Sequence, residues 1–476
     1  MRVTNKIAAS ILAAFVSVSA IALVSFMAPE KSRYIHFANT VTDTGGVEIP
    51  AGSSIGYQMW SNSPYFVNQP DSSIFLYLEA KAIQHTAPAG KRLPLNIALV
   101  LDRSGSMSGD KLAYCKKAAQ FVIDNLDASD RVSIVIYESG VRVLLPATQV
   151  TNKEQIKRMI NGVQVAGGTC MSCGMLSGYA EVKKFFQQQH VNRVLLLTDG
   201  LANEGISLPR QLDSIANEKA NKDRITLSTF GVGADFDEKM LTDLAEYGIG
   251  NYYFIDKPEN VPPIFNKELK GLLEVVAQDA SITLELPAGV SLVKVFGYKY
   301  EQKGNVITVP FRDIFSEEMK SVLVEVKLTV PAVAPLSFTS TFAYNDAVKN
   351  QKGLRLPSTV TLQPTADYAV VDKNYDDYVL QQVTIFKSND LLETAMDRAD
   401  KGDFRGADSI VTYNAFYLNS QGAKVKMATK AFSTQATLNT NYRAKLTEAK
   451  NMDTQSFKLY QKTNRSENYK GKKKKS

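Results

Sequence analysis

The chain has 476 residues, a length that predicts about two to four domains. Hydrophobic residues make up 44% of it and charged residues 22%, which is typical of globular proteins and excludes global disorder. The net charge of +7 is concentrated in residues 451–476, which hold eight Lys/Arg and two Asp/Glu. Nucleic-acid binding is not expected, because no basic domain with interleaved aromatic residues accompanies this segment.

The first 28 residues predict export from the cytoplasm. Arg2 and Lys6 precede an uncharged apolar run over residues 7–28, which is long enough to span a bilayer. The same run fits a signal peptide with a small-x-small cleavage site at residues 20–22. Both interpretations place the rest of the chain in the periplasm or at the cell surface, and cleavage and anchoring remain alternatives. A disulfide can persist in such an oxidising compartment.

Residues 29–90 are mixed and polar, with one predicted strand at 73–83. From residue 91 to 277, apolar strands alternate with helices. The predicted strands lie at 94–101, 131–137, 141–145, 191–198, 225–230 and 252–255, and the predicted helices at 111–126, 153–161, 174–189, 208–220, 237–245 and 261–275. This alternation predicts an α/β fold with a doubly wound, mostly parallel sheet.

Residues 278–365 change to an alternating apolar and polar pattern that predicts an all-β sandwich domain. Its predicted strands lie at 281–287, 290–298, 305–310, 321–330 and 336–344. We expect the strand at 73–83 to join this sandwich, so that the domain at 91–277 is inserted into it.

Residues 366–450 are predicted to form a C-terminal helical region with a helical hairpin joined at Gly402-Asp403. We find no second copy of this hairpin, so a solenoid is not supported. Residues 451–476 form a basic tail, which we expect to be disordered and solvated. Contact of this Lys-rich tail with an anionic surface is the alternative.

Oxygen-bearing side chains follow two of the predicted core strands. The first core strand ends at Asp102, which Ser104 and Ser106 follow at alternate positions, and another strand is followed by Asp199. Thr169 lies in a loop between them. Ligands bind beyond the carboxyl ends of strands in a doubly wound sheet, so these five residues can converge there.

This set of side chains predicts a metal site rather than a nucleophilic one. All five offer oxygen, and two carboxylates with three hydroxyls favour Mg²⁺, with Ca²⁺ or Mn²⁺ as alternatives. Such a site keeps a coordination position open and should attract a carboxylate from outside. Taken alone, the Asp-x-Ser-x-Ser motif also fits a plain helix cap at a strand–helix turn.

The motifs are more specific in combination. An apolar strand, Asp-x-Ser-x-Ser, Gly167-Gly168-Thr169 about 60 residues later, and a second apolar strand ending in Thr198-Asp199-Gly200 closely resemble the von Willebrand factor A domain with its metal-ion-dependent adhesion site. The resemblance covers about residues 93–275 and implies a Rossmann-like fold.

The resemblance also implies roles for the site residues. Asp102, Ser104 and Ser106 would bind the metal directly, Thr169 would do so in the ligand-competent state, and Asp199 would act mostly through water. It further implies divalent-cation-dependent protein binding, in which an Asp or Glu side chain of a protein partner completes the metal's shell.

The region after the predicted metal domain extends the resemblance. Residues 313–324, in a β region, look like the bacterial and plant group whose A domain is followed by a β-sandwich. We therefore expect an exported adhesion or assembly protein. The alternative is a regulatory or accessory subunit of an envelope complex or channel. We expect no enzymatic activity, because the chain contains no HExxH motif and no GxSxG nucleophile elbow.

The three cysteines allow three interpretations. Zinc needs four ligands, and His190 lies about 24 Å along a helix from Cys170 and Cys173, so a zinc site is disfavoured. Thiol redox activity is a second interpretation, because CxxC at a helix N-terminus lowers a thiol pKa. We favour a structural disulfide, either within the loop or from it to Cys115. Such a bond would restrain Thr169, so that oxidation of the two thiols to the disulfide would tune metal or partner affinity.

Overall fold

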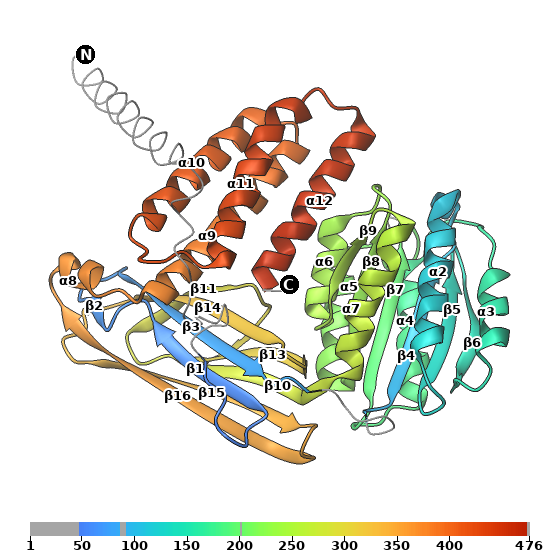
Figure 1. Cartoon of the computed structure of the whole chain (residues 1–476), viewed down its shortest axis with the longest axis horizontal. Helices are drawn as coiled ribbons and strands as arrows, with labels where there is room; N and C mark the ends of the chain where they lie inside the picture. Colours follow the sequence, from blue (N-terminus) through green and yellow to red (C-terminus); the bar gives the residue numbers. More distant parts are fainter. Residues whose placement is uncertain (1–46, 86–91, 200–201, 474–476) are drawn as a thin grey trace, which may run out of the picture. The chain divides into compact units, whose positions relative to one another are not determined.

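The computed structural model describes residues 47–85, 92–199 and 202–473 (Figure 1). The predicted N-terminal leader or anchor at residues 1–28 lies outside these ranges. Within them, no helix combines the length and the apolar character that crossing a membrane requires.

The α/β domain is built on a six-stranded sheet with the strand order β6-β5-β4-β7-β8-β9. Its strands are β4 (Leu95–Asp102), β5 (Arg131–Tyr137), β6 (Val141–Gln149), β7 (Val191–Thr198), β8 (Thr226–Val232) and β9 (Tyr252–Ile255). All neighbouring pairs are parallel except β5 and β6. The predicted mostly parallel sheet is therefore confirmed.

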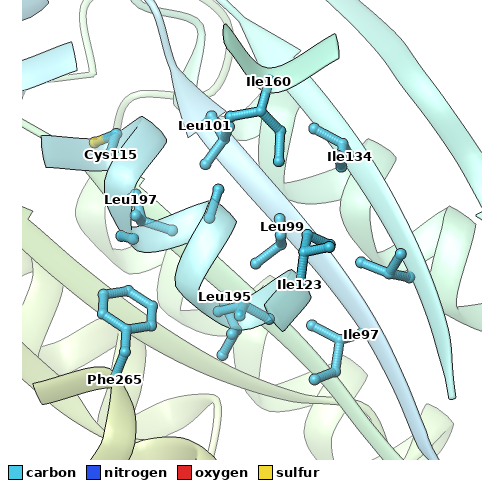
Figure 2. Packing of buried hydrophobic residues seen from close by; sticks show 14 of the residues in the cluster. Ile97, Leu99, Leu101, Cys115, Ile123, Ile134, Ile160, Leu195, Leu197 and Phe265 are labelled. Atoms are coloured by element: carbon cyan, nitrogen blue, oxygen red, sulfur yellow. The ribbon is translucent and has the colours of Figure 1, made fainter. Parts of the chain in front are cut away.

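Helices cover both faces of this sheet. One face packs against α2 (Asp110–Asn125), α3 (Lys153–Asn161) and α7 (Val261–Leu273), and the other against α4 (Met171–Lys184), α5 (Pro209–Glu218) and α6 (Glu238–Tyr247). The alternation of side chains along β4 explains this arrangement, because Leu99 and Leu101 enter the first core while Val100 enters the second. Figure 2 shows Leu99 and Leu101 beside Leu195, Leu197 and other residues of the first core. The sheet is thus doubly wound, as predicted.

Two further sheets form a β-sandwich, with the strand orders β1-β3-β14-β11 and β12-β13-β10-β15-β16-β2. Their strands are β1 (Ile55–Ser61), β2 (Tyr65–Val67), β3 (Ser73–Ala82), β10 (Val275–Glu285), β11 (Val290–Phe296), β12 (Glu301–Lys303), β13 (Val306–Phe315), β14 (Met319–Leu328), β15 (Leu336–Asp346) and β16 (Gln351–Thr365). The strand expected at 73–83 is β3, which pairs with β14 and β1. The sandwich therefore draws strands from both sides of the α/β domain in sequence.

The C-terminal region is helical. Its helices are α8 (Tyr368–Lys373), α9 (Asp377–Asp400), α10 (Phe404–Gly422), α11 (Lys430–Ala449) and α12 (Thr454–Lys473). The predicted turn at Gly402-Asp403 joins α9 to α10, where Gly402 has a φ of 78° and the Asp403 carboxylate accepts a hydrogen bond from the Gly406 amide. The prediction of a disordered basic tail at 451–476 was wrong, because α12 occupies most of that segment.

The basic residues of α12 explain why this segment is ordered. They recur at helical spacing, so that one face meets hydrogen-bond acceptors and acids of the rest of the chain. Lys462 Nζ donates to the backbone oxygen of Phe236 at 2.7 Å, and Arg465 Nη2 lies 2.5 Å from Asp400 Oδ2. Tyr469 completes this face and packs edge-on against Tyr252. The net charge of the segment alone carries no information about this spacing.

Candidate metal centre

Asp102 is the last residue of β4, and its side chain is completely buried. Three donors hold its carboxylate. The Ser104 amide donates to Oδ1 at 2.8 Å, and the hydroxyls of Thr198 and Tyr137 donate to Oδ2 at 2.6 and 3.2 Å. Burial raises the pKa of Asp102 above the usual range of a carboxyl, the hydrogen bonds from Thr198 and Ser104 act to lower it, and the nearby charge of Asp199 adds to the rise. The structure thus keeps a carboxylate at the end of the sheet at a cost in solvation.

The two serines lie beside this carboxylate. A short 3-10 turn, η2 (Gly105–Met107), follows Ser104 and brings its hydroxyl to 3.1 Å from that of Ser106. The Ser106 hydroxyl donates to Asp199 Oδ1 at 2.8 Å, while Lys111 Nζ donates to Asp199 Oδ2 at 2.6 Å. Both oxygens of Asp199 are therefore engaged. This pattern is compatible with the indirect role that the family resemblance implies for Asp199.

Thr169 reaches the same edge of the sheet through backbone contacts. The Gly105 amide donates to the Gly167 carbonyl at 3.0 Å, which joins the loop of Thr169 to the serine loop. The Thr169 amide donates to Asn203 Oδ1 at 2.9 Å, which joins it to the loop after β7. Within the described ranges, no hydrogen bond links the hydroxyl of Thr169 to the other four site residues. Four of the five predicted residues thus belong to one hydrogen-bond network, and Thr169 lies beside this network without a hydrogen bond, among the described residues, from its hydroxyl to those four residues.

The side chains fit a hard divalent cation better than a soft one. In the described part of the chain, no group of three or more His, Cys, Asp and Glu residues is placed to hold a metal ion. The centre offers instead two carboxylates and three hydroxyls, the oxygen donors that Mg²⁺ accepts together with water. No lysine or arginine of the described ranges forms a salt bridge with the buried Asp102. Buried charges are normally paired or bound to metals. A cation bound beside Asp102 would compensate its buried charge.

A disulfide lies directly behind Thr169. Cys170 and Cys173 are bonded, with their Cα atoms 5.3 Å apart, whereas Cys115 is a free, buried thiol of the first core. The predicted disulfide is therefore confirmed, in its form within the loop, and its structural role stays a prediction. Burial raises the pKa of Cys115 well above the ordinary range of a thiol.

The disulfide supports both loops of the centre. Gly205, in the loop after β7, has a φ of 69°, and a Cβ atom there would lie 2.5 Å from Cys170 Sγ. Only glycine fits this close approach with that backbone conformation. The disulfide thus packs between the loop of Thr169 and the loop that follows Asp199. That oxidation of Cys170 and Cys173 tunes metal or partner affinity stays a prediction.

Sequence reasoning missed three residues of the centre. Tyr137 pairs with Asp102 in the register of β4 and β5, and Thr198 ends the neighbouring strand β7. The signal for both was their place at the carboxyl ends of parallel strands. Lys111 gave no such signal, because a lysine in the first turn of a helix is ordinarily solvated.

Comparisons with known proteins identify the type of the α/β domain. Residues 96–267 match the family model of the von Willebrand factor type A domain. The uncharacterized protein YfbK of Escherichia coli is 32% identical over 210 residues, which cover 44% of this chain and 36% of that protein. This chain thus spans only about a third of that relative's length.

Two further similarities extend beyond the α/β domain. The uncharacterized protein sll0103 of Synechocystis is 28% identical over 343 residues, covering 68% of this chain and 78% of that protein. The solved structure of a von Willebrand factor type A protein from Catenulispora acidiphila covers 82% of this chain and 90% of its own, with a TM-score of 0.63 and 15% identity. At that identity the likeness shows the fold alone.

Proposed function

We propose that residues 96–267, which form a von Willebrand factor type A domain, bind a protein partner through Mg²⁺. A domain of this type indicates a protein-binding or adhesion-type function. Asp102, Ser104, Ser106 and Thr169 would hold the ion, and Asp199 would support it indirectly. Bound there, Mg²⁺ supplies a hard positive charge and a coordination position that a partner's Asp or Glu can fill. The buried, salt-bridge-free carboxylate of Asp102 beside two hydroxyls is the observation that carries this proposal.

The hydrogen bonds of the serines favour binding over catalysis. The Ser106 hydroxyl donates to Asp199 Oδ1 and Lys111 binds Oδ2, so both oxygens of this carboxylate are engaged in holding the serine loop and the lysine. The Ser106 oxygen can still face a cation while its hydroxyl proton points to Asp199 Oδ1. We therefore propose a binding protein without catalytic activity.

The predicted leader and the disulfide support a place of action outside the cytoplasm. The apolar segment at 7–28 supports export, and the Cys170–Cys173 bond suits an oxidising compartment. Cys170 is 2% exposed, which makes it a poor site for thiol exchange with other proteins. We propose that the protein works in the periplasm or at the cell surface, with the disulfide in a structural role.

The proposal is tested by capture of partners from an envelope extract on the immobilised protein. We expect Mg²⁺ to support capture of a defined partner, and both EDTA and Asp102→Ala to abolish it. Asp110→Ala is the matched control, because Asp110 is an exposed acid close to the centre in sequence that makes no hydrogen bond to Asp102 or Asp199 among the described contacts. Capture of the same proteins in EDTA and by Asp102→Ala would refute metal-dependent binding.

A further inference from the structure

Lys111 places a built-in positive charge at the metal centre. It belongs to the first turn of α2, and its side chain is 22% exposed. Its Nζ lies 2.6 Å from Asp199 Oδ2 and 3.3 Å from Asp235 Oδ2. Asp199 is completely buried, whereas Asp235 is 40% exposed. The shorter and better shielded contact is thus the one with the site residue.

The position of Lys111 is fixed by packing as well as by charge. Its aliphatic stem crosses Gly233, where a Cβ atom would lie 3.0 Å from Lys111 Cε. Gly233 has a φ of 76°, so glycine both adopts the loop conformation and leaves room for the lysine. The structure therefore directs the ammonium group towards Asp199 rather than into solvent.

Counting charges shows what this lysine does. Asp102 and Asp199 carry two negative charges, which a divalent cation alone would cancel. With Lys111 the loaded centre keeps one positive charge. Asp235 does not remove that charge, because it is shared with Lys458 at 3.2 Å on an exposed surface, where ion pairs are weak.

We propose that Lys111 sets the specificity of the centre for carboxylate-bearing partners by weakening metal binding and strengthening the binding of an acidic group to the loaded metal. This inference rests on the proposed function. Repulsion between the ammonium and the incoming cation lowers metal affinity, and the charge left over attracts the partner's carboxylate. A merely structural lysine would instead stabilise the centre, so that its loss would shift both affinities in the same direction.

The first measurement is Mg²⁺ binding to the full protein by isothermal titration calorimetry. We expect Lys111→Met to bind Mg²⁺ about tenfold more tightly than the wild type, because one unit of nearby repulsion is removed. Lys111→Arg keeps the charge and should bind as the wild type does. Lys116→Met is the matched control, since Lys116 lies on the same helix and donates to the Asn161 carbonyl instead.

The second measurement is carboxylate binding to the loaded centre, with glutarate as the probe. Mn²⁺ replaces Mg²⁺, and glutarate that displaces metal-bound water lowers the water proton relaxivity. We expect Lys111→Met to need about tenfold more glutarate than the wild type for half of this change. Tighter Mg²⁺ binding together with weaker glutarate binding in Lys111→Met supports the proposal. Any other combination of changes in the two affinities would overturn it.

Two further results separate this proposal from the proposed function. Failure of the wild type to bind Mg²⁺ would remove the proposed function itself, whereas equal Mg²⁺ and glutarate affinities in wild type and Lys111→Met would remove only the role of Lys111. Far-ultraviolet circular dichroism in EDTA verifies that each variant is folded. Lys111→Gln is a second uncharged variant, which decides the question if Lys111→Met does not fold.

Discussion

Asp102→Ala is expected to abolish the thermal stabilisation that Mg²⁺ gives to the wild-type protein. A ligand that binds only the folded state adds about 2.7 kcal/mol at a concentration of 100 times its Kd. For a domain of this size, that gain corresponds to a rise in Tm of about 5–10 °C. The variant lacks the buried carboxylate that the ion compensates, so its Tm should not respond to Mg²⁺.

Differential scanning calorimetry with Mg²⁺ and with EDTA measures this response. Asp110→Ala removes an exposed acid from the start of α2 and should keep the full Mg²⁺-dependent rise. An equal rise in Asp102→Ala and wild type would show that the ion binds elsewhere on the protein.

Glu268→Ala is expected to lower the free energy of unfolding by about 3–5 kcal/mol, because it leaves the buried Arg193 with only the longer salt bridge to Asp313, at 3.6 Å, among the described residues. Glu268 is fully buried on α7, and Arg193 on β7 is 3% exposed. The carboxylate accepts hydrogen bonds from Arg193 at 2.7 Å, Ser228 at 2.6 Å, Asn251 at 2.7 Å and Tyr253 at 2.8 Å. One side chain therefore ties α7 to three strands of the sheet.

The stability that Glu268 provides should depend on pH. Burial opposes its charge, but Arg193 and the hydrogen bonds from Ser228 and Asn251 lower its pKa from 4.5 to about 2. A carboxyl with a lowered folded-state pKa stabilises the protein above its unfolded-state pKa. The wild type should therefore lose this advantage over Glu268→Ala as pH falls from about 4.5 to 2.

Urea unfolding at several pH values measures both effects. Glu259→Ala, which removes an exposed acid just before α7, should change the free energy of unfolding by less than about 0.5 kcal/mol. A difference between Glu268→Ala and wild type that stays constant from pH 7 to pH 2 would contradict the assignment of the lowered pKa.

The α/β domain could be predicted because its strands are buried on both faces. The residues of β4 and β7 are all buried, and both strands carry apolar runs in the sequence, at 97–101 and 194–197. The candidate metal centre could be located in the sequence because Asp102 and Asp199 follow these runs at the ends of the strands. In each case the sequence neighbours of the feature carry the signal.

Features that depend on distant partners could not be predicted in this way. Strand β16, which pairs with β2 over only three residues on its outer side, has mostly exposed or half-buried residues, including Lys352, Arg355 and Pro357, so its pattern is weakly apolar. Strand β1 lies in the polar segment at 29–72 and is held by its pairing with β3. The order of α12 likewise depends on contacts with residues more than 60 positions away.

The position of Lys111 beside the candidate metal centre likewise depends on residues that are distant in the sequence. Its partner Asp199 lies 88 positions later in the chain, and its packing partner Gly233 follows another strand. Only the arrangement of β4, β7 and β8 in one sheet brings the three together. A sequence suggests candidate ligands for such a centre, whereas the charges that surround them depend on the fold.

Anomalous diffraction from crystals of the full protein soaked with Mn²⁺ tests the central claim most directly. Mn²⁺ shares the preference of Mg²⁺ for oxygen ligands and gives an anomalous signal that locates it. We predict a peak within about 2.3 Å of the Ser104 and Ser106 hydroxyl oxygens, beside Asp102 and Thr169. A well-occupied Mn²⁺ site elsewhere on the protein, with no peak at these hydroxyls, would contradict the assignment of the metal centre.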